Sequence, residues 1–469
     1  MESLSLARLA LDLDLTPPHG SEAVTLTGVS TDTRTLRPGE VFFALSGENH
    51  DGARFVLEAF RRGARAAVAP IHTPDPGQGR PVLRVRDTVE ALLRFAGAYR
   101  ARLGFQVVAV TGSAGKTTTK ELVWHLAAAE RRAVRSQKSF NNHVGVPLTL
   151  LSADAGTEVA VVEVGTSSPG EIARLAAVAR PDVAVITCVG AAHLEGLGGL
   201  EGVAKEKLSL LEALGPRGVA VLNGDDPRLR AGGERFARER GRASVLLCGL
   251  GAGVELGGQI ERGAPARRLR VSDARALPLR VPGRAFAQDV LLALGAARAL
   301  GLSPVSAAAA LRGFAPPPGR MHLIEVGGVT LVDDSYNANP TSVGASLEAL
   351  SDLAEPEERL VVLGGMKELG AGGAELHRDI GRRVAELGAA LLVAVGPEAR
   401  EIALGAAEAG LAPACIRAVD QPREAVDALA GELRPGRAVL FKASRACRLE
   451  EAWAAVRERL LTAGARRAA

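Results

Sequence analysis

The sequence is short of cysteine, of long apolar runs and of net charge, and each shortage excludes a class of protein. Only four of the 469 residues are cysteines, and no two of them have C-x-x-C spacing, so neither a disulfide framework nor a zinc site is indicated. No apolar run reaches the roughly 18 residues that a membrane-spanning helix needs. Glu2, Asp12 and Asp14 interrupt the first residues, where a signal peptide would need an apolar stretch. We therefore expect a reduced, cytoplasmic protein without stable membrane insertion.

The net charge of +4 is small for this length and argues against a dedicated nucleic-acid binder. Hydrophobic residues make up 47% and charged residues 23% of the chain, as in soluble globular proteins. A chain of 469 residues is too long for one ordinary core. Two to four domains are expected, and three is the natural number.

Lysine is also scarce, because 57 lysines and arginines include only seven lysines. A lysine that persists against this bias is a candidate for a role that arginine cannot fill. The seven are Lys116, Lys120, Lys138, Lys205, Lys207, Lys367 and Lys442.

The pattern of apolar runs divides the chain into three α/β regions. Residues 1–102 hold strand-like runs at 41–45 and 66–69 around a helical stretch near 53–63. Residues 103–315 begin with a buried-strand pattern at 105–110, which a glycine-rich turn joins to a helical stretch at 118–130. Further strands are predicted at 158–164, 182–187 and 218–222, a β-rich stretch at 243–282 and a helix at 288–300. This alternation predicts a doubly wound domain with a parallel sheet.

A Pro-Pro-Pro-Gly stretch at 316–319 marks the second boundary, because it cannot continue a helix. Beyond it, residues 316–469 alternate helices with strands predicted at 329–333, 360–363, 390–395 and 438–442. A second, smaller α/β domain is expected there.

Residues 111–118, T-G-S-A-G-K-T-T, lie between a predicted buried strand and a predicted helix. This is where a loop that binds phosphate through backbone N–H groups belongs. Lys116 would neutralise charge on a transferred phosphoryl group, and the Thr117 hydroxyl would ligate Mg²⁺. The loop is a shortened variant of G-x-x-x-x-G-K-[ST], since position 110 is valine and the first glycine is Gly112.

This shortened loop resembles that of the Mur ligase family, and further motifs follow in the family's order. They are N-N-H-V-G-V-P at 141–147, E-V-G followed by G-E-I at 163–172, A-H-L-E-G at 192–196, K-E-K at 205–207, D-D-S-Y-N-A-N-P at 333–340 and E-L-G at 368–370 with His377. The last two, with S-T-D-T-R at 30–34, are similar to the member of the family that adds D-alanyl-D-alanine.

The resemblance implies a three-domain α/β architecture with a central P-loop domain and a C-terminal Rossmann-like domain. It implies an ATP-dependent ligase that joins D-alanyl-D-alanine to UDP-N-acetylmuramoyl-tripeptide through an acyl phosphate. Residues 1–102 would bind the UDP-sugar peptide, 103–315 ATP and Mg²⁺, and 316–469 the dipeptide, closing over ATP. A monomer is expected.

The resemblance also assigns site residues. ATP would contact Gly112, Ser113, Ala114, Gly115, Lys116, Thr117, Thr118, Arg320 and Asp334; the other substrates would contact Ser30, Asp32, Arg34, Asn141, Asn142, Asn337 and Asn339. Catalytic roles fall to Lys116, Glu163, His193 and Lys207, and two Mg²⁺ ions would be held by Thr117, Glu163, His193 and Lys207.

Lys207 matches a family lysine that CO₂ converts to a carbamate, an oxygen ligand that arginine cannot form. Lys205 shares the segment and, from the residues alone, is an equal candidate. For Lys442 and Arg445, a role in positioning substrate and a structural role are equally open.

The sequence departs from the family where part of the adenine pocket is expected. Ala285 and Phe286 replace a histidine and an asparagine, and Asp289 replaces a second asparagine. Gly364 and Gly365 replace a glycine–aspartate pair before Met366, and Ala443 replaces a glycine in K-G-S-R.

Three alternative functions are considered, which differ from this one in substrate or in the class of protein. The member that adds the third amino acid carries D-N-P-R when it uses diaminopimelate, and that string is absent here. Folylpolyglutamate synthase lacks the N-terminal UDP-binding region. A P-loop regulator that binds ATP without ligating anything would have no reason to carry Glu163, His193 and Lys207 together.

Overall fold

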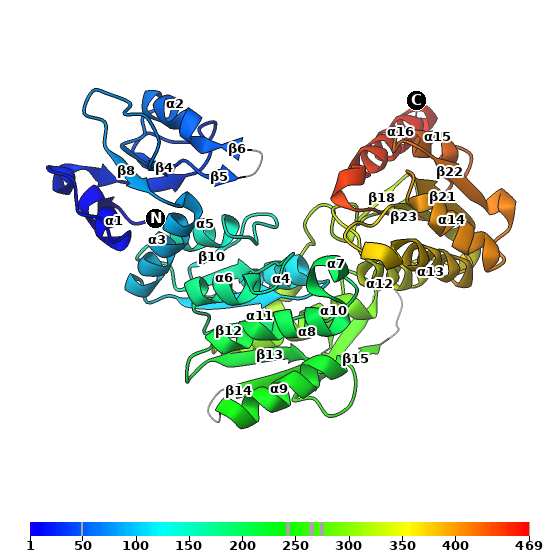
Figure 1. Ribbon diagram of the computed structural model, residues 1–469. Helices are drawn as coiled ribbons and strands as arrows, with labels where there is room; N and C mark the ends of the chain where they lie inside the picture. Colours follow the sequence, from blue (N-terminus) through cyan, green and yellow to red (C-terminus); the bar gives the residue numbers. More distant parts are fainter. Residues whose placement is uncertain (48–49, 241–243, 262–266, 273–275, 469) are drawn as a thin grey trace.

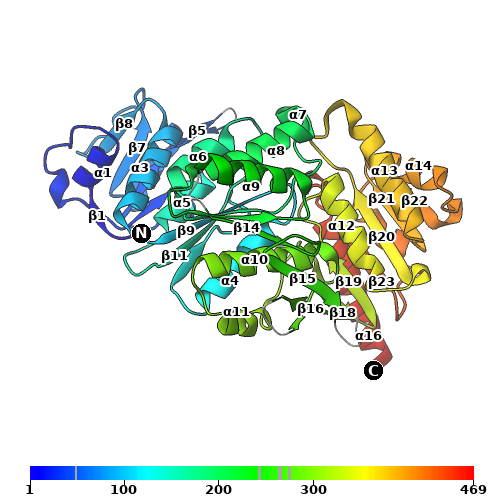
Figure 2. The ribbon, with the colours of Figure 1, turned by 90° about the horizontal axis from the view of Figure 1, so that it is seen from below.

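The computed structural model describes residues 1–47, 50–240, 244–261, 267–272 and 276–468. The chain forms three lobes, each built around its own principal sheet (Figure 1). The N-terminal lobe, in blue, and the C-terminal lobe, in yellow to red, both lie against the central lobe, and Figure 2 shows the three in a row. The sequence-based prediction of a three-region α/β protein is confirmed.

The N-terminal lobe has a four-stranded parallel sheet whose two inner strands are those predicted from apolar runs. Its strands are β3 (Gly28–Ser30), β4 (Glu40–Phe43), β7 (Ala66–Pro70) and β8 (Val82–Val85), in that order. The predicted helix near 53–63 is α2 (Val56–Arg61), preceded by a 3₁₀ turn. A short helix, α1 (Leu6–Asp12), opens the chain.

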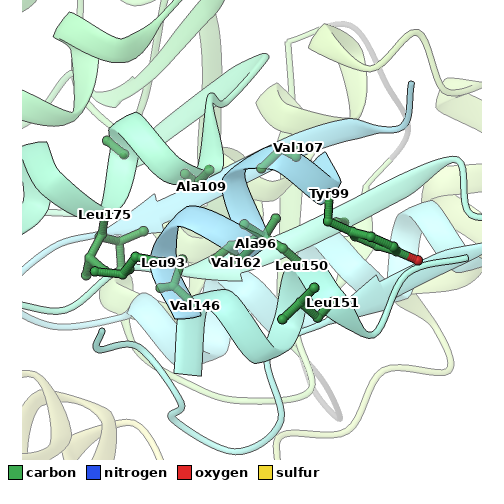
Figure 3. Close-up of a cluster of buried hydrophobic side chains, with 14 of the residues drawn as sticks. Leu93, Ala96, Tyr99, Val107, Ala109, Val146, Leu150, Leu151, Val162 and Leu175 are labelled. Carbon is green, nitrogen blue, oxygen red and sulfur yellow. The ribbon is translucent and has the colours of Figure 1, made fainter. Parts of the chain in front are cut away.

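Helix α3 (Thr88–Arg102) joins this lobe to the central one by packing on two central helices, α5 (Gly145–Leu151) and α6 (Glu171–Ala179). Figure 3 shows Leu93 of α3 among Val146 and Leu175. These side chains belong to one buried cluster that also contains residues of β4 and β7, so the two lobes share a hydrophobic core.

The central sheet has nine strands, and those next to the phosphate loop are buried on both faces. The order is β10 (Ala133–Arg135), β11 (Val159–Glu163), β9 (Gln106–Thr111), β12 (Val183–Ile186), β13 (Val219–Asn223), β14 (Ser244–Gly249), β15 (Leu256–Glu261), β16 (Arg268–Val271) and β17 (Leu277–Pro278). β10 to β15 are parallel and the last two strands are antiparallel. Helices cover both faces, which explains why the inner strands read as unbroken apolar runs.

The predicted strands at 158–164, 182–187 and 218–222 are therefore confirmed as β11, β12 and β13. The β-rich stretch at 243–282 contains β14 to β17, although 262–266 and 273–275 lie outside the described residues. The predicted helices are α4 (Lys116–Ala128) and α10 (Arg284–Ala299).

The C-terminal sheet is parallel except for its first strand. Its order is β18 (His322–Val326), β19 (Val329–Asp333), β23 (Ala438–Lys442), β20 (Arg359–Gly364), β21 (Leu391–Val395) and β22 (Ile416–Val419). The four predicted strands are the four inner ones. The two edge strands, β18 and β22, were not predicted, because they are only partly buried and lack an apolar run.

Helices cover this sheet as well, with α12 (Pro340–Ser351), α13 (Gly373–Glu386) and α14 (Ala399–Glu408) in sequence order and α16 (Glu450–Ala468) at the end of the chain. Among the described residues, no helix is both long and apolar enough to cross a membrane.

Candidate active site between the central and C-terminal lobes

A cavity of about 920 Å³ lies between the central and C-terminal lobes. On the central side it is lined by the loop after β9, by the residues that follow β11 and β12, and by the start of α10. On the other side it is lined by Arg320, by the segment after β19 and by the segment after β23. Ligands of open parallel sheets bind beyond the carboxyl ends of the strands, so this is where a substrate is expected.

The phosphate-loop motif forms a tight turn between β9 and α4. Gly115 has φ +79°, and a Cβ built on it would lie 2.4 Å from Asp289 Oδ1. A Cβ on Gly112 would lie 1.8 Å from Thr187 Oγ1. Both positions therefore need glycine. The first residues of α4 line the cavity, and no side chain caps their N–H groups, so this helix start can serve as an anion site.

Lys116, the first residue of α4, folds back over this loop. Its Nζ donates a hydrogen bond to the Gly112 carbonyl at 2.6 Å. Burial lowers the pKa of Lys116, and the nearby Glu163 carboxylate opposes that shift. A half-buried ammonium held beside the loop is suited to receive a phosphate group.

Thr117 and Glu163 form a buried pair of oxygen groups next to the loop. Thr117 Oγ1 donates to Glu163 Oε2 at 3.0 Å, and Asn141 Nδ2 donates to Glu163 Oε1 at the same distance. Lys120, which is fully buried and was not predicted as a site residue, places its Nζ 3.7 Å from Glu163 Oε2. Hydroxyl and carboxylate oxygens are ligands that Mg²⁺ accepts, so this pair fits a magnesium site.

His193 adds a nitrogen to the same cavity from the turn before α7 (Leu194–Leu197). Its Nδ1 contacts the carboxylate of Glu368, which belongs to the C-terminal lobe. Burial lowers the pKa of His193, Glu368 opposes the shift, and the ammonium groups of Lys116 and Lys207 add to it. A neutral imidazole is the form that can ligate a metal.

The structure separates the two lysines that the sequence left open. Both lie on α8 (Leu200–Leu208), but Lys205 is exposed, whereas Lys207 is 2% exposed and lines the cavity. Burial, together with the nearby ammonium group of Lys116, lowers the pKa of Lys207 to about 7. Residues two apart on a helix point in different directions, which explains the contrast.

Thr117, Glu163, His193 and Lys207 thus all line one cavity. Across the described part of the chain, no group of three or more His, Cys, Asp and Glu side chains is arranged to hold a metal ion. The predicted ligand set would not be found by this criterion, because only Glu163 and His193 belong to these four residue types.

Arg320 and Asp334 reach the cavity from the C-terminal lobe. The Arg320 guanidinium lies 4.3 Å from the centre of the Tyr336 ring and donates to Ser139 Oγ at 3.4 Å. Asp334 accepts hydrogen bonds from Lys442 Nζ at 2.5 Å and from Ser346 Oγ at 2.6 Å. Lys442 is therefore one half of a buried ion pair, which favours a structural role for it.

Two of the predicted substrate asparagines hold the backbone in place. Asn339 caps α12 by accepting from the Ser342 N–H at 2.8 Å, and its Nδ2 donates to the Ser113 carbonyl at 3.0 Å. Asn142 accepts from the N–H groups of Val144 and Gly145. Asn337 also lines the cavity. The bond from Asn339 to Ser113 links the C-terminal lobe to the phosphate loop, a contact that the motifs alone did not indicate.

Ser30, Asp32 and Arg34 lie in the N-terminal lobe, away from the residues that line the cavity. The Ser30 hydroxyl donates to the Asp32 carbonyl at 2.9 Å, and the Arg34 guanidinium pairs with the Asp32 carboxylate at 2.6 Å. The three therefore form a separate polar cluster.

Three of the positions that depart from the family pattern, Ala285, Phe286 and Asp289, line the cavity at the start of α10. Phe286 stacks on Phe314, with ring centres 6.1 Å apart. Asp289 accepts a hydrogen bond from Thr119 Oγ1 at 3.0 Å, and burial raises its pKa to about 8. Gln288, between them, was not predicted as a site residue, because no motif singled it out.

Comparison with known proteins covers all three lobes. Family models match residues 25–100 (Mur ligase family, catalytic domain), 110–297 (Mur ligase middle domain) and 319–445 (Mur ligase, glutamate ligase domain). The UDP-N-acetylmuramoyl-tripeptide–D-alanyl-D-alanine ligase of Bacillus subtilis is 33% identical over 431 residues, covering 92% of this chain and 93% of that protein.

Solved structures of Mur ligases are also similar to this chain over most of its length. MurF from Acinetobacter baumannii superposes with a TM-score of 0.86 at 26% identity, covering 98% of this chain and 99% of that one. MurF ligase from Thermotoga maritima, solved in complex with ADP, has a TM-score of 0.81 at 30% identity and covers 92% of this chain and 97% of that one.

Proposed function

Because the chain belongs to the Mur ligase family, we propose that it is the ATP-dependent ligase that joins D-alanyl-D-alanine to UDP-N-acetylmuramoyl-tripeptide. Relatives with that name match it over most of its length. The observation that best supports the proposal is that two of the motifs lie opposite each other in one cavity. The D-D-S-Y-N-A-N-P segment of the D-alanyl-D-alanine-adding member faces the phosphate loop, and Asn339 is bonded to Ser113.

Amide formation needs an activated carboxyl group. A carboxylate oxygen of the peptide attacks the γ-phosphorus of ATP, ADP leaves, and an acyl phosphate forms. The amine of the dipeptide then attacks the acyl carbon, loses a proton and expels phosphate. Lys116 would stabilise negative charge on the transferred phosphoryl group, and the N–H groups of the loop would hold it in line.

Mg²⁺ would neutralise phosphate charge when bound, and Thr117, Glu163, His193 and Lys207 are the residues that would hold it at two sites. For Lys207 this requires a carbamate, formed when the neutral amine adds to CO₂ and releases a proton. Its burial and its pKa of about 7 support this, since a large fraction of the amine is neutral near pH 7.

We assign the UDP-sugar peptide to residues 1–102, ATP to 103–315 and the dipeptide to 316–469. The polar cluster of Ser30, Asp32 and Arg34 supports the first assignment, and the phosphate loop supports the second. The contacts of Arg320, Glu368 and Asn339 with the central lobe support closure of the third region over ATP. We expect the protein to act as a monomer in the cytoplasm.

The direct test is product formation by the purified protein. ADP and phosphate should be released only when ATP, UDP-muramoyl-tripeptide and D-alanyl-D-alanine are all present. Equal turnover with UDP-muramoyl-dipeptide and a single diamino acid would instead identify the member that adds the third residue. ATP binding without any ligation, across all candidate peptides, would favour a regulator.

A further inference from the structure

The E-L-G segment of the C-terminal lobe is held in place by the buried ring of His377. Its Nε2 accepts a hydrogen bond from the Met366 N–H at 2.9 Å, and its Nδ1 donates to the Gly373 carbonyl at 2.6 Å. A backbone N–H can only donate and a carbonyl can only accept, so these two bonds fix the tautomer of the ring. His377 therefore joins the two ends of the segment 366–373, which contains Glu368.

Glu368 contacts His193 of the central lobe. Its carboxylate meets Nδ1 of the imidazole, which is buried and, among the described residues, has no hydrogen-bond partner that competes with this contact. Two residues further on, a Cβ built on Gly370 would lie 3.4 Å from the Cβ of Glu195, so the two segments pack together. In Figures 1 and 2, α7, which follows His193, lies next to the C-terminal lobe.

Both residues at this contact have an uncommon backbone conformation. His193 has φ +54° and Glu368 has φ +62°, in the left-handed region that residues other than glycine seldom occupy. Such conformations persist only where the surrounding structure holds them, and they concentrate at functional sites. The contact between the two lobes is therefore a candidate for a functional role.

The chemistry of a histidine that binds a metal suggests which role this is. When one ring nitrogen binds the metal, the other usually donates a hydrogen bond to a carboxylate or a carbonyl, and that bond fixes the orientation of the ring. With Nδ1 directed at Glu368, His193 presents Nε2 as the nitrogen for a metal. Thr117, Glu163 and Lys207, the other groups that we propose as ligands, line the same cavity.

We propose that Glu368 is a positioning residue for the metal site, because it orients the His193 ring and does so only while the C-terminal lobe is closed on the central lobe. The inference rests on the proposed role of His193 as a ligand of Mg²⁺. Metal binding at His193 and closure of the lobes then favour each other, since such coupling is reciprocal. Within the E-L-G motif and His377, Glu368 makes the contact and His377 holds the segment that carries it.

The test uses Mn²⁺ with the full-length protein and β,γ-methylene ATP, which is not hydrolysed. Pulsed electron paramagnetic resonance of wild type should show the coupling of a histidine nitrogen to Mn²⁺, and His193→Ala should lose it. Glu368→Ala should bind Mn²⁺ at this site about 10–100-fold more weakly and show a reduced nitrogen coupling, because the ring is no longer oriented. Glu368→Gln keeps an accepting oxygen and should lie between wild type and Glu368→Ala.

Glu401→Ala is the matched control, because its carboxylate pairs with Arg378 at 2.7 Å within the C-terminal lobe and does not line the cavity. It should keep the affinity and the nitrogen coupling of wild type. Small-angle X-ray scattering tests the link to closure. Mg²⁺ with the same nucleotide should lower the radius of gyration of wild type and lower that of Glu368→Ala less.

The Glu368 side chain is 58% exposed, so its replacement should leave the fold intact, which thermal unfolding checks. Equal Mn²⁺ affinity and equal nitrogen coupling in wild type and Glu368→Ala would overturn the inference. So would a wild-type spectrum without a histidine nitrogen, which needs no variant. Neither result affects the ligase proposal, which stands or falls on product formation by wild type.

Discussion

The two ends of the cavity are built on different principles. The phosphate end brings together charged groups and the groups that we propose as metal ligands, and the pKa values of both lysines and the histidine are lowered. It comprises Lys116, Thr117, Glu163, His193 and Lys207.

The base end comprises Leu250, Val281, Phe286, Gln288 and Asp289 and is largely apolar. It contains the Gln288 oxygen, which has no partner among the described residues, and a carboxyl group whose pKa is raised to about 8. The phosphate end matches the family motifs, and the base end departs from them. Neutralising a transferred phosphoryl group needs particular residue types in fixed places. A flat base can be bound by packing and one hydrogen bond, which several sets of residues can supply.

The largest expected effect lies at the phosphate end and concerns Lys207. Lys207→Arg keeps the charge but cannot form a carbamate. It should lower kcat by about 10²–10³, the typical effect of removing one electrostatic element of this kind. Lys205→Arg, on the exposed side of the same helix, is the control and should keep a near-normal rate. Steady-state kinetics of the two variants test this prediction. A near-normal kcat for Lys207→Arg would disprove the carbamate.

Asp289 should make the base end sensitive to pH through stability. An unfolded aspartate has a pKa of about 3.9, whereas burial raises that of Asp289 to about 8. Between these values the native state keeps a proton that the unfolded chain has lost, so the free energy of unfolding falls as pH rises. Asp289→Asn does not titrate and keeps an acceptor for Thr119. It should therefore gain about 1–3 kcal/mol over wild type between pH 5 and 8 and gain no more well above pH 8.

Thermal unfolding measured from pH 5 to 9 provides the test of Asp289, with about 2–4 °C expected for each kcal/mol in a unit of this size. Parallel pH profiles for the variant and wild type would show that Asp289 is ionised in the native protein.

Asn339 joins the two lobes at the phosphate end, and two substitutions separate its two contacts. Asn339→Ser keeps a helix cap but is too short to bond Ser113, whereas Asn339→Ala loses both contacts. Alanine should cost about 1 kcal/mol of stability, the usual value of a cap. Both variants should lower kcat by about three- to tenfold, the effect of one hydrogen bond. Unfolding and kinetics measured together test this, and a fully active Asn339→Ser enzyme would contradict a role for the link in catalysis.

The smallest effect is expected at Phe286. Phe286→Leu keeps most of the volume but removes the flat ring, so the KM for ATP should rise by about threefold while kcat changes little. Phe314→Leu removes the other ring of the stack and serves as the control, because Phe314 does not line the cavity. Equal effects of the two substitutions would mean that Phe286 acts only as core packing.

Much of the fold could be predicted, because its inner strands are apolar on both faces and therefore leave a signal in the sequence. Strands β9, β11, β12 and β13 are of this kind. The edge strands β18 and β22 have no such signal in the sequence, because solvent reaches part of each strand and polar residues are tolerated there.

By itself, the sequence determined the order of the lobes, the position of the phosphate loop and the residue types available around it, because local patterns and motifs encode these. The tertiary structure decided which lysine of α8 is buried, that Lys442 pairs with Asp334, and that Asn339 bonds to Ser113. It also decided that the Gln288 oxygen has no partner in the described part of the chain. Each of these depends on the packing of segments distant in the chain, since burial and hydrogen-bond partners belong to the folded arrangement and not to any one stretch of sequence.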